Sequence, residues 1–115
     1  MELANIGELV AQYEAALQTE YRCKEDFLAA HTHAEEFEAK ELSQAYDDGV
    51  IDGKNAEQRK LQTVALLAQN EAVQLARAAK AEAERAASLA EIERKRMDAM
   101  ISLVRAWLYS QSGGR

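Results

Sequence analysis

One short stretch, GVIDGKNAEQR at positions 49–59, interrupts a chain that otherwise keeps a helical pattern almost throughout. It contains two of the five glycines, and the 115-residue sequence has no proline. Glycine and proline are the residues that most often mark turns, so a chain with one such interruption has few ways to fold. The sequence therefore predicts an all-α protein made of two long helices joined at a single bend.

The ends of both predicted helices have recognisable signals. Apolar residues spaced three and four apart predict a first helix over about 3–48. Gly49 suits the left-handed position after a helix, and Val50 can supply the apolar contact of a Schellman motif, so the turn should span 49–54. Asn55 is a preferred N-cap, with Gln58 placed to complete a capping box. The second helix is predicted to run unbroken over about 55–111, before a flexible tail at 112–115.

The two helices are predicted to form one domain over residues 1–111, an elongated antiparallel hairpin. The numbers of facing residues should then sum to about 104, so that Leu3 lies near Ile101. Large side chains of the first helix would face the alanine-rich part of the second, which favours close packing. The second helix would project beyond the first and leave five residues there as an oligomer or partner interface: Leu103, Val104, Trp107, Leu108 and Tyr109.

Such a hairpin is too thin to bury its own apolar faces. We therefore expect a homo-oligomer, a dimer or a larger assembly, in which the hairpins form a helical bundle or coiled coil.

Charge is distributed unevenly along the chain, whose net charge is −6. Residues 1–48 carry 12 acidic and 3 basic side chains, and residues 49–115 carry 8 acidic and 11 basic. An acidic face near the end of the first helix could bind a basic protein or occupy a DNA-binding groove; the alternative is a solvated helix face. Its members are Glu35, Glu36, Glu38, Glu41, Asp47 and Asp48.

Two groups of basic or capping residues are candidates for binding anions. One lies at a helix N-terminus, where free N–H groups favour a phosphate or nucleotide, although simple capping is the alternative. The other could contact nucleic-acid phosphates, although in the predicted register Glu8 and Glu14 lie near Arg94 and would neutralise it. The first group is Lys54, Asn55, Arg59 and Lys60, and the second is Arg94, Lys95 and Arg96.

The sequence does not favour catalysis, a metal or a cofactor. In the HTHAE segment only His31 and Glu35 share a helix face, and two ligands do not hold zinc. The serines have no histidine within plausible reach, and a helical rod lacks an enclosing pocket that would shift a carboxylate pKa. A single cysteine, Cys23, and the lack of a long apolar stretch indicate a cytoplasmic protein without a membrane partner.

The segment GVIDGKNAEQRKLQ, followed by a long helix rich in Ala, Glu and Arg, resembles small all-helical proteins of tailed bacteriophages. In those proteins the turn has the pattern G-x-I-x-G-K-N-A-E-x-R. The resemblance implies a viral accessory role in the cytoplasm of a bacterial host. We expect a non-enzymatic interaction protein that binds and inhibits a host defence protein or nuclease. The alternatives are a DNA-associated replication or recombination accessory protein and an oligomeric nucleotide-sequestering protein.

Overall fold

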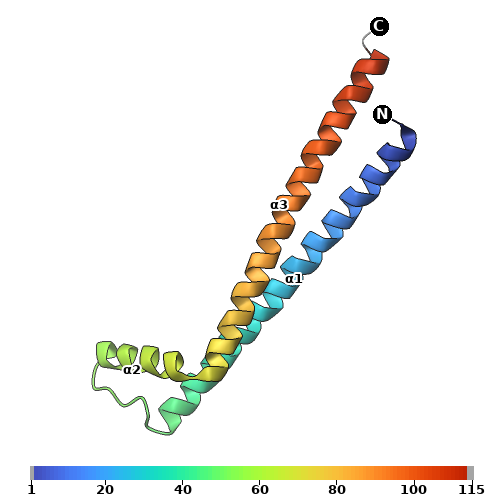
Figure 1. Ribbon diagram of the computed structural model, residues 1–115. Coiled ribbons are helices and arrows are strands. Elements are labelled where there is room, and N and C mark those ends of the chain that lie inside the picture. Colours follow the sequence, from blue (N-terminus) through green and yellow to red (C-terminus); the bar gives the residue numbers. More distant parts are fainter. Residues whose placement is uncertain (1, 114–115) are drawn as a thin grey trace. The chain divides into compact units, whose positions relative to one another are not determined.

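A computed structural model describes residues 2–113 of the chain, which contain three α-helices and no strand. The helices are α1 (Leu3–Asp47), α2 (Ala56–Gln69) and α3 (Glu71–Gly113), as Figure 1 shows. The prediction of an all-α protein is confirmed. None of these three helices combines the length and the apolar character that crossing a membrane requires.

The first helix ends as its sequence predicts, in a Schellman motif. Gly49 has a φ of +73°, the Val50 N–H donates to the Ala45 carbonyl at 2.9 Å, and the Gly49 N–H donates to the Tyr46 carbonyl at 3.2 Å. The apolar residue that becomes buried is Ile51, which is 4% exposed, whereas Val50 is 55% exposed. The apolar partner expected at Val50 is therefore supplied by the next residue.

The chain leaves the helix once more than predicted, at Asn70. The unbroken helix expected over 55–111 is instead divided into α2 and α3. The Asn70 Oδ1 accepts a hydrogen bond from the Val73 N–H at 3.1 Å and so caps α3. The Asn70 Nδ2 donates to Glu41 Oε2 at 3.1 Å, and Gln74 Nε2 donates to the Leu67 carbonyl at 2.9 Å. These bonds satisfy groups that a helix break would otherwise leave unpaired.

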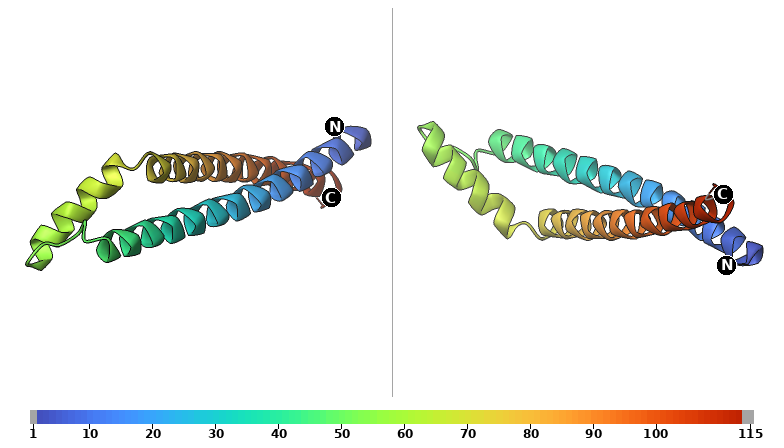
Figure 2. Two further views of the ribbon diagram at one scale, coloured as in Figure 1. Left: turned by 90° about the horizontal axis from the view of Figure 1, so that it is seen from below. Right: turned by 90° about the horizontal axis from the view of Figure 1, so that it is seen from above.

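Because α2 ends at Gln69 and α3 begins at Glu71, their axes can differ in direction, and Figure 2 shows α2 departing from the first turns of α3. At its far end α3 continues two residues beyond the expected position, to Gly113. Ser112, which was predicted to belong to the flexible tail, is therefore helical. Residues 114–115 of that tail lie outside the described residues.

The chain divides into two compact units. Unit 1 comprises residues 1–25 and 84–115, and unit 2 comprises residues 26–83. In unit 1 the first half of α1 and the second half of α3 run antiparallel. Leu9, Ala16 and Met97 form its core, with Tyr13, Ile101 and Val104 packed against them. Buried and half-buried residues recur at steps of three and four along both helices, as in coiled-coil packing.

Unit 2 contains the second half of α1, all of α2 and the start of α3. Val73 is fully buried, and Ala34, Ile51 and Leu67 are less than 9% exposed. Arg77 of α3 forms an ion pair with Glu38 of α1. These contacts hold the beginning of α3 against α1 inside this unit.

The pairing register differs from the predicted one. Glu20 pairs with Arg94 in unit 1 and Glu38 with Arg77 in unit 2, so the partner numbers sum to 114 and 115 rather than about 104. The difference is caused by α2. Its 14 residues come between α1 and α3 in the sequence, so they belong to the connection and shift the midpoint of the chain reversal towards the C-terminus. By the same sum Leu3 would face residue 111, so the expected overhang of the last helix is wrong.

Candidate interaction surfaces

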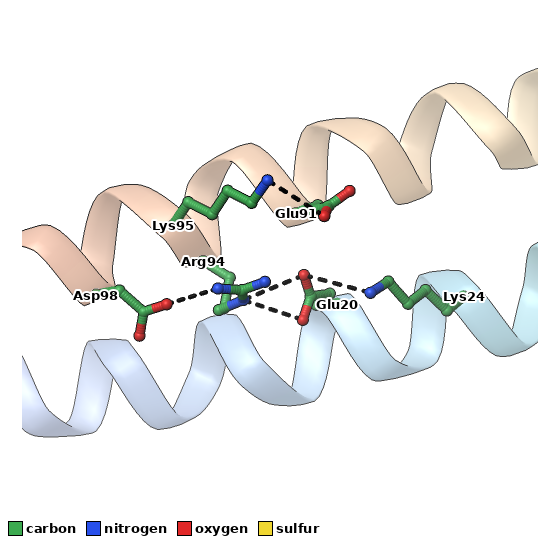
Figure 3. Close-up of polar contacts among 6 residues, drawn as sticks. All are labelled: Glu20, Lys24, Glu91, Arg94, Lys95 and Asp98. Atoms are coloured by element: carbon green, nitrogen blue, oxygen red, sulfur yellow. Dashed lines mark hydrogen bonds and ion pairs between the residues drawn. The ribbon is translucent and has the colours of Figure 1, made fainter.

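A network of charged side chains crosses between α1 and α3 in unit 1 (Figure 3). Glu20 is the one buried charged residue among those the structure describes. The Arg94 Nε lies 3.2 Å from both carboxylate oxygens of Glu20, and its Nη1 donates to Asp98 Oδ2 at 2.6 Å. Lys24 adds an ion pair with Glu20 at 3.7 Å. Since a buried charge such as Glu20 is costly without its partner, this network fixes the register of the two helices.

The contacts of the network favour the ionised forms of Asp98 and Arg94 and the neutral form of Tyr13. Hydrogen bonds from Tyr13 and Arg94 lower the pKa of the Asp98 carboxyl. The same contact with Asp98 raises the pKa of the Tyr13 hydroxyl, and Asp98 and Glu20 together raise the pKa of the Arg94 guanidinium. These shifts arise from the hydrogen bonds that join α1 to α3, so the network is a structural element.

All three residues of the candidate nucleic-acid site are paired with carboxylates. Arg94 belongs to the network above, and Lys95 lies 3.4 Å from Glu91. Arg96 makes two hydrogen bonds to Glu93, from Nε at 3.0 Å and from Nη2 at 2.6 Å. The Arg94 partner is Glu20 rather than Glu8 or Glu14, but the expected neutralisation by acidic side chains is present.

At the candidate anion site at the start of α2, side chains of the same segment already accept hydrogen bonds from the backbone N–H groups. The Gln62 Oε1 accepts from the N–H groups of Asp52 at 3.1 Å and Gly53 at 2.8 Å. Gln58 Oε1 accepts from the Lys54 N–H at 2.9 Å, and the predicted N-cap Asn55 accepts from the Gln58 N–H at 2.8 Å. The capping box is therefore modified, because Gln58 reaches Lys54 instead of the N-cap itself.

Of the charged members of that site, Arg59 is hydrogen-bonded to the loop before α2. Arg59 Nη1 donates to the Gly53 carbonyl at 3.1 Å, and Asp52 accepts from Gln62 Nε2 at 2.8 Å. A Cβ on Gly53 would lie 2.8 Å from the Gln58 Cβ, so the close approach of the loop to α2 requires glycine there. Lys54 and Lys60 are exposed. The geometry corresponds to the capping alternative, and Gln62 is the residue that sequence reasoning missed.

The six residues of the candidate acidic face do not lie on a single surface. Glu38 and Glu41 are half-buried, and they contact Arg77 of α3 and Asn70, the residue before α3. Glu35 lies 3.1 Å from His31 Nε2 on the same helix face, as predicted for that pair, and Asp48 accepts from Gln44 at 2.9 Å. Glu36 and Asp47 are exposed on α1. The structure leaves these last two as the freely presented acidic residues of the set.

The five candidate interface residues near the C-terminus also do not share one face of α3. Val104 packs against the core of unit 1. Leu108 and Tyr109 are five and six residues from Leu103 along α3, so helical geometry directs them to other sides of the helix. Leu103 and Trp107 are four residues apart and share a face, at 72% and 40% exposure. That face continues towards the N-terminus of α3 through residues that sequence reasoning did not include. We call Leu89, Ile92, Met100, Leu103 and Trp107 the α3 stripe.

A shallow groove borders the α3 stripe. Its α1 side is lined by small or polar side chains (Gln12, Ala15, Ala16 and Thr19), and its α3 side by Ala90, Glu93, Arg96 and Met97. Small side chains on one helix beside a row of large ones on the other form the groove and the ridge that pack together when helices associate. Unit 1 therefore presents both the apolar α3 stripe and, beside residues 90–97, a groove.

Within the part of the chain that the structure describes, no cluster of three histidine, cysteine or acidic side chains could hold a metal ion. Cys23 is half-buried and carries a free thiol.

Comparison with known proteins adds no relative: no protein-family model, curated protein or solved structure matches this chain.

Proposed function

We propose that the chain is a non-enzymatic protein-interaction protein that works as a homo-oligomer. The observation that carries the proposal is the apolar surface of unit 1. Of the 17 large apolar side chains exposed in the described residues, 11 belong to this unit, whereas the large apolar residues that it buries in its core are Leu9 and Met97. An exposed apolar surface of this extent is typical of protein contacts. Association of antiparallel hairpins into a helical bundle would cover it.

Unit 2 supplies the surface for a foreign partner. Residues 26–83 contain 11 acidic and 6 basic side chains, whereas unit 1 contains 9 acidic and 8 basic. The exposed Glu36 and Asp47 would attract a basic protein surface and increase the rate of encounter. A basic surface is characteristic of proteins that bind nucleic acid. Together with the resemblance to phage proteins, this favours a phage-encoded accessory protein that obstructs a host nuclease or defence protein.

Binding of nucleic acid or of a nucleotide by this chain receives less support. The basic residues Arg94, Lys95 and Arg96 already contact carboxylates, and each phosphate would have to displace such a partner. The N–H groups before α2 are hydrogen-bonded to Gln58 and Gln62. Both alternatives therefore begin with the loss of existing bonds.

Affinity capture from a bacterial lysate tests the proposed function. Three forms are compared: the wild type, the double variant Glu36→Lys/Asp47→Lys, and the matched control Glu8→Lys/Glu14→Lys, which reverses two exposed charges on the same helix in unit 1. We expect a basic protein to be retained by the wild type and the control, and to be lost with the first variant and at high salt. An eluate that contains nucleic acid alone, or equal retention by all three forms, would contradict the proposal.

A further inference from the structure

The α3 stripe is a continuous face of one helix. Leu89, Ile92, Arg96, Met100, Leu103 and Trp107 follow one another at steps of three or four residues, so their side chains lie on the same side of α3. The five apolar members are between 36% and 72% exposed. The buried residues Ala87, Ala90 and Met97 lie on a different side, facing α1. An apolar face of this length, separate from the core, requires a second surface to cover it.

We propose that the α3 stripe binds the same stripe of a second copy of this chain, with the two α3 helices antiparallel about a two-fold axis. The inference rests on the proposed function, which requires an oligomer, and adds the surface and the orientation. It also assigns a role to Leu89, Ile92 and Met100, which lie outside the predicted interface.

Charge favours a second copy as the occupant. Unit 1 has 9 acidic and 8 basic side chains, so two copies meeting through this unit scarcely repel each other. Two copies meeting through unit 2, with 11 acidic and 6 basic, would bring like charge together.

The spacing of the stripe favours the antiparallel orientation. With the two-fold axis level with residue 98 along α3, Leu89 lies opposite Trp107 of the second copy, Ile92 opposite Leu103, and Arg96 opposite Met100, because the numbers of each pair sum to 195 or 196. A two-fold interface requires such self-complementarity. In a parallel pair each residue would face the same residue of the second copy, so that the two Arg96 side chains would lie against each other.

Arg96 is compatible with an interface at this place. Its guanidinium binds the Glu93 carboxylate at 2.6 and 3.0 Å, and its Nη1 lies 3.5 Å from the Met100 sulfur. The arginine is therefore neutralised by a residue of its own helix and lies along the stripe. Arginine is among the residues enriched in protein interfaces, whereas an isolated charge would oppose burial.

Sedimentation equilibrium of the full chain tests the surface. The variants are Leu103→Glu and Leu75→Glu, which change the same residue type at the same 72% exposure, within and outside the stripe. We expect the wild type and Leu75→Glu to have twice the chain mass of 12.8 kDa. Leu103→Glu should weaken association by about 100-fold or more, because a carboxylate would enter an apolar contact. Helix content from circular dichroism checks that each variant is folded.

Spin labels test the orientation without altering the stripe. A label on Ser88→Cys, in a Cys23→Ala background, lies on the exposed surface beside Leu89. In an antiparallel pair the two labels are 20 residues apart along the helix axis, or about 30 Å, whereas a parallel pair brings them to about 10 Å.

The outcomes are distinguishable. A wild type that remains monomeric at all concentrations overturns this inference and the oligomeric part of the proposed function. A dimer that withstands Leu103→Glu overturns the inferred surface alone. A label distance near 10 Å overturns the antiparallel orientation and retains the surface.

Discussion

Substitution of Asn70 tests whether this one side chain maintains the break between α2 and α3. Asn70→Ala removes the N-cap of α3, which costs about 1 kcal/mol. It also removes the hydrogen bond to the half-buried Glu41 carboxylate, which at this partly exposed position adds about 1 kcal/mol. The total, about 2 kcal/mol, corresponds to a roughly 30-fold increase in local opening at the start of α3.

Hydrogen exchange at the Val73 amide measures this opening directly, because that N–H is the one that Asn70 caps. Asn70→Asp provides the sharper variant, since it keeps the capping oxygen but places a carboxylate against Glu41. We expect Asn70→Asp to be destabilised and to recover when Glu41→Gln is added, because the new amide can donate to the aspartate. Unchanged exchange in Asn70→Ala, or an Asn70→Asp variant as protected as the wild type, would refute the assignment.

Three further predictions concern the core, the charge network and the first turn. Met97→Ala should lower the free energy of unfolding by about 3 kcal/mol in urea titrations, because Met97 is 2% exposed in the core of unit 1; a loss below about 1 kcal/mol would contradict this packing. The lowered pKa of Asp98 means that its contribution to stability is present above the ordinary carboxyl pKa and is lost as pH falls through the lowered value. Unfolding followed below about pH 4 should thus show a steeper loss of stability for the wild type than for Asp98→Asn, and equal slopes would contradict the network. Gly49→Ala should cost about 1 kcal/mol because of its positive φ, while Gly7→Ala, in an exposed helical position, should stabilise the protein by about 0.5–1 kcal/mol; thermal unfolding that moves in the same direction for both would contradict the assignment.

The ends of the helices at the predicted turn could be inferred from the sequence because their chemistry is local. In the Schellman motif the Gly49 N–H donates to a carbonyl three residues back and the Val50 N–H to one five residues back, and Asn55 caps an N–H three residues ahead. Neither interaction needs a partner from elsewhere in the fold. The all-α composition is predictable for the same reason, since it reflects the intrinsic preferences of each residue.

Prediction of the break at Asn70 would have required more than the helical pattern of apolar residues. Asparagine followed by Glu71 has the form of an N-cap and an acidic first turn, and this signal was present. The hydrogen bond to Glu41 spans 29 positions, however, and could not be anticipated without the fold. The error in the predicted register has the same origin: without the break at Asn70, α2 was not recognised as part of the connection between the antiparallel segments.

The prediction of the candidate sites was limited in the same way, because local contacts can be inferred from the sequence and distant ones cannot. The sequence places Glu38 and Glu41 beside Glu36, but only the packing of α3 shows that the first two face Arg77 and Asn70. In contrast, the α3 stripe could have been recognised from its spacing alone. Only Leu103 and Trp107 of the stripe were included in the predicted interface, because the incorrect register attributed the exposure of Trp107 to an overhang of the helix. Trp107 is exposed because of the side of α3 on which it lies.

The fluorescence of Trp107 is the most direct measure of whether unit 1 is covered by a second copy. It is the sole tryptophan, it lies on the α3 stripe, and it is 40% exposed in the single chain. Across a dilution series that spans the change in mass from dimer to monomer, we expect its emission to move to longer wavelength and acrylamide quenching to increase. Leu103→Glu should show the diluted spectrum at every concentration. Emission and quenching that stay constant while the mass halves would contradict the account.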